Sequence, residues 1–385
     1  MTAPRVWSVV LLAALAAPLV TWLGHLGPRL PWLGLPPYPE ALGMDLYPSH
    51  LYFFLLFGAL AVLIGAQDKW LGLTLAYLGL VIFWRGMRLD PTHSVMFAVG
   101  AFALWAMRQT PPRWWPIVAT ALSLAGAVQA VYMLQQAWFK YDLLWGPLFG
   151  GVLNEPQYIR AIGTIGSVDA AGAYVAITAA LMPAWLLPLA GIAVWQSHSL
   201  GALLALVVAL GLRYRHLGLR VYAASLALIA AGVGFRLSGL SSHSAGWGSF
   251  ADRLTIWTLG VRLAAASDPA WGWGLGGWIT QVPQAQICLN VWPTKEVWAQ
   301  AHSEPIQWAC ETGLVGLLLL SLWCYSHRAA FVTHTAWGAA TAAAAVNALV
   351  FFPFHQVALA LLAIVVTALA TAPAGWPPAD GAVTT

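Results

Sequence analysis

One histidine and two carboxylates stand where a polar segment runs into a long apolar stretch. His302 and Glu304 precede this stretch, Glu311 lies at its start, and the residues from Gly313 to Leu320 are almost entirely apolar. At such a place a membrane enzyme can carry out water-side chemistry on a substrate held by lipid, and an imidazole can take up a proton near neutral pH. A purely structural alternative is that Ser303 caps a helix with Pro305 in its first turn.

The composition indicates that lipid surrounds most of this chain. Of its 385 residues, 60% are hydrophobic and only 8% are charged, and the mean hydropathy is +0.74. A soluble domain carries roughly 25% charged residues. The formal charge of +4 comes from basic residues scattered between apolar runs, which does not predict a nucleic-acid partner. The three cysteines indicate neither a disulfide framework nor a metal cluster.

The apolar runs predict an all-α polytopic membrane protein with about twelve transmembrane helices, since a helix needs about 20 residues to cross the bilayer. They form one predicted domain over residues 1–372, and a disordered cytoplasmic tail is expected over residues 373–385. A short crossing from about residue 184 to residue 195 completes the set. The clearest runs are residues 6–26, 51–66, 70–84, 94–107, 115–135, 170–188, 199–212, 221–235, 306–325, 336–352 and 355–372.

The distribution of charge predicts the orientation of these helices. With a cytoplasmic N-terminus, the short inner loops are basic, as the positive-inside rule requires. The outer side then receives several arginines, which oppose this bias and therefore favour a functional role. These outer arginines include Arg85, Arg88, Arg160, Arg253 and Arg262.

Three outer loops are long enough to build a site, namely residues 27–50, 137–167 and 237–305. The last is rich in Trp, Gly and Pro and too short for a core of its own, so we expect a lid on the membrane surface. Within it, residues 253–263 predict an amphipathic helix with Arg253 and Trp257 one turn apart. The run 271–278 favours backbone turns near headgroups or sugars.

Several short motifs follow one another in order between residues 160 and 320. They are Arg160-Ala161-Ile162-Gly163-Thr164, Ser197-His198-Ser199-Leu200-Gly201, Arg253-Leu254-Thr255-Ile256-Trp257, Asp268-Pro269 with Gly272-Trp273-Gly274-Leu275-Gly276, and His302 with Gly313-Leu314-Val315-Gly316. This ordered set resembles the O-antigen ligase and O-antigen polymerase superfamily. The resemblance covers residues 160 to 320 and the apolar C-terminal part, while residues 1–150 resemble the family only in hydropathy.

This resemblance implies a bacterial inner-membrane glycosyltransferase of the C type, inverting, independent of metals and without a cofactor, whose active site faces the periplasm. Its donor would be a glycan on a polyprenyl (undecaprenyl) pyrophosphate. The acceptor could be lipid A core sugar, as in an O-antigen ligase of lipopolysaccharide biosynthesis, a growing polysaccharide, as in a polymerase, or a protein hydroxyl. We favour the ligase.

The resemblance also assigns roles to residues. His302 would deprotonate the acceptor hydroxyl, and Arg253 and Arg160 would hold the pyrophosphate, because arginine binds phosphate oxygens bidentately. Glu304 would orient His302, although a solvated charge at a helix N-terminus is a simpler explanation. Arg253 could equally place its charge among lipid headgroups without any catalytic role.

Two positions depart from the family pattern. Many members read Ser-Arg-Gly or Ser-Arg-Ala where this chain has Ser197 and His198, so protonated His198, or Arg85 or Arg88, would have to replace the arginine. The usual Asn-Pro-Asn is here Val168-Asp169-Ala170, with an acid in place of an amide. Both changes make the donor site harder to assign than the fold.

A transporter or flippase is the main alternative from another functional class. Such proteins place ionisable groups at the bilayer midplane, at about 2.5 to 3.5 kcal/mol each, and use broken helices in symmetric halves. In this chain the apolar runs are nearly free of charge and the charged residues gather in the outer loops. This distribution favours surface chemistry over transport, and a structural scaffold would not need the outer Arg and His residues.

Overall fold

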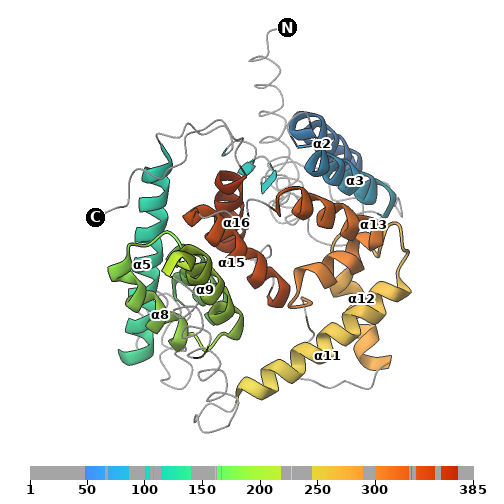
Figure 1. Cartoon of the computed structure of the whole chain (residues 1–385). Coiled ribbons are helices and arrows are strands. Elements are labelled where there is room, and N and C mark those ends of the chain that lie inside the picture. The colour runs from blue at the N-terminus through green and yellow to red at the C-terminus, as the bar shows by residue number, and fades with distance from the viewer. Residues whose placement is uncertain are drawn as a thin grey trace, which may run out of the picture. The chain divides into compact units, whose positions relative to one another are not determined.

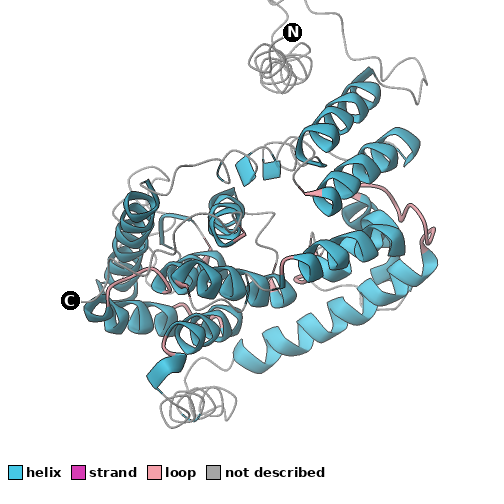
Figure 2. Cartoon of the chain, turned by 45° about the horizontal axis from the view of Figure 1, so that its top comes forward, coloured by secondary structure: helices cyan, strands magenta, loops and turns pink. Residues whose placement is uncertain are grey.

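The computed structural model of this protein is mostly helical, with short loops and no strand, in the part of the chain that it describes (Figure 2). Apart from scattered single residues, that part comprises residues 48–65, 68–85, 114–139, 163–165, 167–217, 245–288, 300–328, 335–351 and 357–371. The predicted helix 6–26, most of the predicted helices 94–107 and 221–235, most of the loops 27–50 and 137–167 and the tail 373–385 lie outside the described residues.

The chain divides into two compact units. Unit 1 consists of Met1–Phe102, Ile256–Ala301 and Pro305–Ser326, and unit 2 of Ala103–Thr255, His302–Glu304 and His327–Thr385. His302 and Arg253 therefore belong to the same unit, although 49 positions separate them in the chain (302 − 253).

Unit 1 contains an antiparallel helix pair and the segments around a kinked helix. The pair is α2 (Pro48–Gly65) and α3 (Lys69–Arg85), which pack along each other. The C-terminal half of α11 (Ala245–Ala266), then α12 (Gly277–Cys288) and most of α13 (Glu304–Ser326) complete the unit (Figure 1).

Unit 2 is built around the short helix α7 (Val168–Ala179). This helix packs against α5 (Trp115–Phe139), α8 (Leu187–Gln196), α9 (Leu200–Arg213), α15 (Ala336–Val350) and α16 (Val357–Ala370). Its sequence is rich in alanine, and small side chains let neighbouring helices approach closely. The first turn of α7 is thereby held firmly inside the unit.

Three helices of unit 2 begin at hydroxyl residues that cap them. Ser167, Ser199 and Thr335 accept hydrogen bonds from the backbone N–H groups of Ala170, Ala202 and Gly338, at the starts of α7, α9 and α15. An N-terminal cap of this kind satisfies one of the unpaired N–H groups of a helix end and contributes about 1 kcal/mol. The caps thus fix where the three helices start.

The helices largely follow the predicted apolar runs, with three corrections. Residues 170–188 do not form one helix, because α7 ends at Ala179 and the chain continues through the 3-10 turn Ala184–Leu186 into α8. Pro183 precedes this turn and provides no backbone N–H to continue a helix. The predicted helix 306–325 is broken at Gly313, and α12 was not predicted because its Gln and Pro residues break the apolar pattern.

Two of the described helices, α5 and α13, are long and apolar enough to cross a membrane. The other apolar helices in the described ranges are shorter; α9, with 14 residues, extends only about 21 Å at 1.5 Å per residue. Composition and these two helices together support a membrane protein. The number of twelve crossings remains a prediction.

Candidate active site

His302 lies in an unusual backbone conformation immediately before α13. Its φ is 51°, in the left-handed region that few non-glycine residues adopt, although histidine tolerates it better than most. The ring lies beside that of Phe351, with 6.4 Å between the ring centroids and 50° between their planes. Residues held in this region often occur at active sites, because the surrounding structure must compensate for the strain.

The surroundings of His302 favour the neutral imidazole. Burial, which has the largest effect, and the positive charge of Arg253 lower the pKa of His302 to about 4, against the opposing effect of the negative charge of Asp169. Near neutral pH the ring is therefore unprotonated and able to accept a proton. The sequence left the role of Asp169 open, so the proximity of Asp169 to this imidazole was not predicted.

Arg253 is held by two partners from two other helices. Its Nη2 donates to Oδ2 of Asp169 at 3.1 Å, and its Nη1 donates to the carbonyl oxygen of Val350 at 3.1 Å. The side chains of Arg253 and Asp169 are only 12% and 22% exposed. A guanidinium group has five N–H donors, so these two contacts leave donors for an anionic ligand.

Helix ends explain why these partners stand where they do. Asp169 lies in the first turn of α7, where the positive end of the helix dipole stabilises a carboxylate. Val350 is the last residue of α15, so no N–H group of the helix donates to its carbonyl oxygen, and a cationic donor can satisfy it. One arginine thus links the N-terminal end of α7 to the C-terminal end of α15.

The beginning of α7 is itself anchored by buried polar groups. The side-chain Oε1 of Gln136, on α5, accepts the backbone N–H of Gly163 at 2.7 Å, in the short 3-10 turn Gly163–Ile165. Gln136 is fully buried. Gly163 has a φ of +59° in this turn, in the left-handed region that favours glycine.

The remaining predicted residues divide into three groups. Glu304 is buried at the start of α13, next to the turn that carries His302, and His198 is exposed on the turn between α8 and α9 with a φ of 55°. No described contact joins His198 to Arg253. Arg160 and Arg88 lie outside the described residues.

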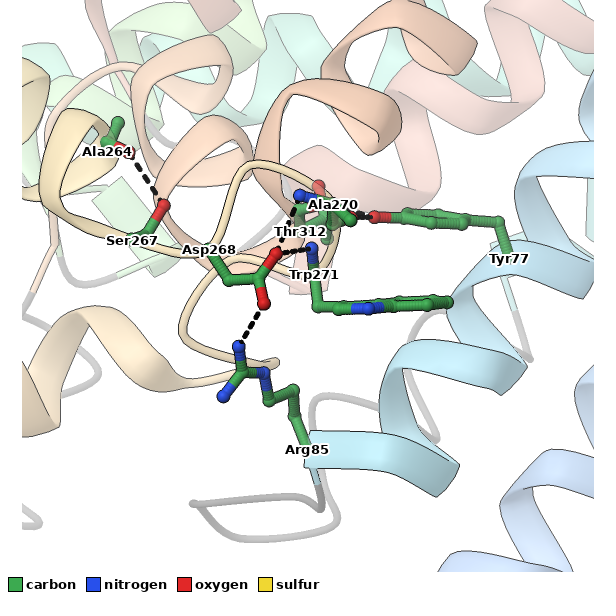
Figure 3. A network of polar contacts seen from close by, with 8 residues as sticks. All are labelled: Tyr77, Arg85, Ala264, Ser267, Asp268, Ala270, Trp271 and Thr312. Carbon is green, nitrogen blue, oxygen red and sulfur yellow. Dashed lines mark hydrogen bonds and ion pairs between the residues drawn. The ribbon is translucent and has the colours of Figure 1, made fainter.

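Arg85 has a partner within unit 1 (Figure 3). Its Nη2 donates to Oδ2 of Asp268 at 2.6 Å, and Oδ1 of Asp268 accepts the backbone N–H groups of Ala270 and Trp271 at 2.8 and 3.3 Å. These two N–H groups and the guanidinium lower the pKa of Asp268. A phosphate that bound Arg85, as the sequence predicted, would therefore have to compete with the carboxylate of Asp268.

The glycine-rich motif after Asp268 packs onto the break in α13. The N–H groups of Trp273 and Gly274 donate to the carbonyls of Cys310 and Glu311, at 2.9 and 3.0 Å. The N–H of Leu314 donates to the carbonyl of Pro269 at 2.8 Å. These bonds replace helical bonds lost at Gly313, whose φ of 70° and ψ of −175° require glycine. The motif is thus a backbone clamp on α13.

The same motif is fastened to α3 by aromatic side chains. The rings of Tyr77 and Trp271 stack with their centroids 5.8 Å apart, and Trp84 lies on Trp271 at 6.4 Å. The Tyr77 hydroxyl donates to the carbonyls of Ala270 and Thr312. Figure 3 shows Trp271 and Tyr77 lying parallel beside the Arg85–Asp268 pair. Trp271 and Trp84 thus pack against each other, whereas the sequence predicted that the run 271–278 lies near headgroups or sugars.

Sequence reasoning missed Asp169, Val350 and Phe351 as members of the site. Asp169 was visible as an acid in place of an amide, and such an acid in a chain whose motifs also contain Arg253 is the signal that could have paired the two. Val350 contributes only its backbone carbonyl, which no side-chain pattern can reveal. Phe351 looks like any other apolar residue at a helix end.

Comparison with known proteins agrees with the motif-based resemblance. Residues 170–321 match the model of the family described as O-antigen ligase. No curated protein and no solved structure matches the chain. Both His302 and Arg253 fall in the matched region, and Asp169 directly precedes it. Over residues 170–321, the resemblance of the chain to the O-antigen ligase and polymerase superfamily of membrane glycosyltransferases is thereby confirmed.

Proposed function

We propose that this protein is an inner-membrane glycosyltransferase that moves a glycan from a polyprenyl-pyrophosphate donor to an acceptor hydroxyl at the periplasmic face. The acceptor that we favour is lipid A core, which makes the protein an O-antigen ligase. The observation that carries the proposal is that His302 and Arg253 lie close enough in unit 2 for the arginine charge to lower the pKa of the imidazole. A neutral base and a fixed cation are the two groups that this transfer needs.

In the proposed reaction, the oxygen of the acceptor hydroxyl attacks the anomeric carbon of the donor sugar. A new carbon–oxygen bond forms as the bond from that carbon to the pyrophosphate breaks. The hydroxyl proton passes to the His302 imidazole, and the electron pair of the broken bond stays on the leaving pyrophosphate. The free N–H donors of Arg253 stabilise the negative charge that develops there.

Donor binding would also adjust the basicity of His302. In the unbound site, Arg253 keeps the pKa of His302 low, so the ring is a weak base. A pyrophosphate bound at Arg253 brings negative charge that offsets the arginine, and a nearby anion raises the pKa of an imidazole. The base would thus strengthen only when the donor is in place, which limits proton transfer in its absence.

His302→Ala tests the proposal directly. We expect at least a 100-fold loss of transfer from a lipid-linked donor, since general base catalysis contributes about 10²- to 10⁴-fold. His216→Ala is the matched control, because His216 is an exposed histidine of the same unit. Both variants are measured in detergent after their melting temperatures are compared. Full activity of a stably folded His302→Ala protein would exclude His302 as the base.

The acceptor is identified by the glycolipids of a deletion strain, separated on a gel. Loss of every capped core, with accumulation of lipid-linked polymer, supports the ligase. Cores that carry a single repeat unit support a polymerase instead. Normal core glycans together with an unglycosylated protein support transfer to a protein hydroxyl. Movement of the lipid-linked glycan across vesicles without any transfer would support the flippase and contradict the enzyme.

Chelators provide a second test of the chemistry. The proposal assigns charge stabilisation to arginine, so addition of EDTA is expected to leave the transfer rate unchanged. The measurement is repeated with Mg²⁺ or Mn²⁺ restored after dialysis. A rate that falls with EDTA and returns with one of these ions would replace the arginine-based mechanism with a metal-assisted one.

A further inference from the structure

Asn347 is a buried polar residue in an otherwise apolar helix. It lies on α15 with 1% of its surface exposed, and neither its side-chain Nδ2 nor its Oδ1 has a hydrogen-bond partner in the described part of the chain. A buried amide without a partner costs about 1 to 3 kcal/mol. Within a membrane helix, a polar residue of this kind is a functional candidate by default.

The other polar residue of α15 shows that the helix can satisfy its own side chains. Thr341 is equally buried, at 1% exposure, and its hydroxyl donates to the carbonyl of Trp337 at 2.8 Å. Threonine can make this bond to the preceding turn, whereas neither edge of the Asn347 amide has a partner among the described residues. Asn347 therefore differs from its neighbour in needing a group from outside the helix.

Asn347 lies beside the candidate active site. A Cβ atom placed on Gly201, in the first turn of α9, would lie 3.4 Å from Nδ2 of Asn347 and 3.0 Å from Cγ2 of Val350. Asn347 and Val350 thus face the same turn of α9, three residues apart on one side of α15. The carbonyl of Val350 holds Arg253, and the next residue, Phe351, contacts His302.

The distance along the helix places the amide within reach of a bound sugar. Three residues of an α-helix rise about 4.5 Å, so Asn347 lies about one turn inside the end of α15. Gly201, which Asn347 faces, lies in the first turn of α9, where the helix dipole adds positive partial charge. A donor whose pyrophosphate contacts Arg253 would bring its first sugar to this end of the helix.

The two unpaired edges indicate what kind of group the amide binds. Nδ2 donates and Oδ1 accepts, so a complete partner must offer both an acceptor and a donor side by side. A phosphate offers acceptors only and would leave Oδ1 unpaired. Two neighbouring hydroxyl groups of a sugar ring satisfy both edges at once.

We propose that the Asn347 side-chain amide binds two neighbouring hydroxyl groups of the donor sugar and thereby selects which sugar is transferred. The inference rests on the proposed function, because it assigns a sugar-reading residue to the same site. A site that is built to bind hydroxyl groups discriminates strongly against sugars that lack them, since its own polar atoms are then left unpaired.

The test combines variants with a panel of donors. Asn347→Leu replaces the amide by an apolar side chain of similar size, and Thr341→Val is the matched control on the same helix. The donors are synthetic polyprenyl-pyrophosphate hexoses, one intact and the others each lacking one hydroxyl. Melting temperature and kcat/KM are measured for every pair.

With the intact donor, Asn347→Leu should lower kcat/KM by about 10- to 100-fold, which corresponds to the cost of one or two lost hydrogen bonds. The melting temperature should stay equal or rise, because an unpaired buried amide has been removed. With the one or two donors that lack the bound hydroxyls, the variant and the unmodified protein should differ by less than threefold. Thr341→Val should keep the full kcat/KM for every donor.

Two results would overturn the inference. Either Asn347→Leu keeps the kcat/KM of the unmodified protein, or its loss is the same for every donor of the panel, which would indicate an indirect structural role. If Asn347→Leu does not fold, Asn347→Ser is measured with the same panel and judged by the same donor dependence. If the unmodified protein transfers sugar and Asn347→Leu leaves kcat/KM unchanged, this inference alone is contradicted. If the unmodified protein turns over no donor, the proposed function is contradicted as well.

Discussion

At the scale of single residues, the candidate site is defined by the balance of two opposite charges beside one neutral ring. Asp169 and Arg253 form an ion pair, and the pKa of His302 responds to both. Burial is the largest influence on that pKa, with Arg253 second and Asp169 opposing them. Changes at any of the three residues should therefore appear in the dependence of activity on pH.

The pH dependence of the enzyme provides the first prediction. Since the pKa of His302 is about 4 in the free protein, kcat/KM should stay constant as pH falls from 7 and decline only near pH 4. The acidic limb of kcat should lie at higher pH, because bound pyrophosphate offsets Arg253. Steady-state rates across this range measure both limbs. Coinciding limbs would contradict the proposed effect of the donor.

The same shift affects stability with a defined sign. The folded protein holds His302 with a pKa of about 4, below the ordinary 6.5, so the unfolded chain binds more protons between these values. The contribution of His302 to stability is therefore complete above about pH 6.5 and is lost as pH falls toward 4. In His302→Ala this part of the dependence of melting temperature on pH should disappear. An unchanged dependence would mean that the ring is solvated.

Asp169→Asn removes one charge and keeps the shape of the side chain. The pKa of His302 should fall further, because Asp169 normally raises it, and the acidic limb of kcat/KM should move to lower pH. We expect kcat to drop about tenfold as Arg253 loses its ion-pair partner, with no rise in KM, since the site becomes more positive. Asp252→Asn is the control, because Asp252 is exposed and precedes Arg253 on the same helix. A shift toward higher pH would contradict this account of the site.

At the scale of elements, the break in α13 depends on the backbone of Gly313. A Cβ atom at this position would lie 2.6 Å from the carbonyl oxygen of Pro269 and 2.9 Å from the nitrogen of Gly272. These backbone atoms belong to the clamp that follows Asp268, so they cannot move away independently. The sequence places glycine at 313 and at 272 for the same close contact.

Gly313→Ala should therefore destabilise the protein by at least about 2 kcal/mol, from the left-handed backbone and the steric overlap together. Gly58→Ala is the matched control within unit 1, because Gly58 lies in α2 and nothing stands within 4 Å of its added Cβ. That variant should be neutral or gain up to about 1 kcal/mol. Thermal unfolding in detergent measures both, and equal effects would refute the clamp.

The Asp268 turn provides a finer comparison. Asp268→Asn keeps an acceptor for the N–H groups of Ala270 and Trp271 and removes only the charge that pairs with Arg85. Both side chains of that pair are about one third exposed, so solvent screens the pair and the melting temperature should fall only slightly. Asp268→Ala also removes the acceptor of these two N–H groups and should lower the melting temperature further. Equal melting temperatures for the two variants would show that the hydrogen bonds contribute little.

The sequence predicted the helices better than it predicted the contacts between them. Apolar runs indicated α2, α3, α5, α9, α13, α15 and α16 with ends within a few residues, because hydropathy reports burial in lipid or core directly. Proline and glycine breaks were missed where the lost bonds are replaced by distant backbone, as at Gly313. His302 and Arg253 were identified through motifs, whereas Val350 takes part through a carbonyl group that every residue possesses. Asn347 stayed unnoticed because one amide in an alanine-rich run has no local pattern.

At the scale of the whole molecule, orientation in the membrane is the main prediction that can be tested with the described residues. The distribution of charge predicts that His198 faces the outside and Arg215 the inside, on opposite ends of α9. This helix is about 21 Å long, shorter than the roughly 30 Å of the hydrocarbon core. An experiment is therefore needed to test whether α9 crosses the membrane.

Single cysteines at His198 and His216 answer it, since both histidines are exposed. In a background in which Cys288, Cys310 and Cys324 are replaced by serine or alanine, an impermeant maleimide should label His198→Cys in intact cells whose outer membrane is permeabilised. His216→Cys should react only after the inner membrane is opened. Labelling of both from one side would mean that α9 does not cross, and the predicted orientation of the following segments would then be wrong.

The glycine break in α13 also affects how the protein responds to its lipid surroundings. A continuous rod would carry any tilt imposed by a thicker or thinner bilayer along its whole length to the histidine at its start. The φ of 70° at Gly313 instead divides the rod into a nine-residue piece, Glu304–Thr312, and an apolar remainder, and the backbone bonds to Cys310 and Glu311 hold the first piece in place at the break. Transfer rates should therefore vary little among vesicles of different acyl-chain length, which would let one enzyme work unchanged as membrane thickness adapts to growth temperature.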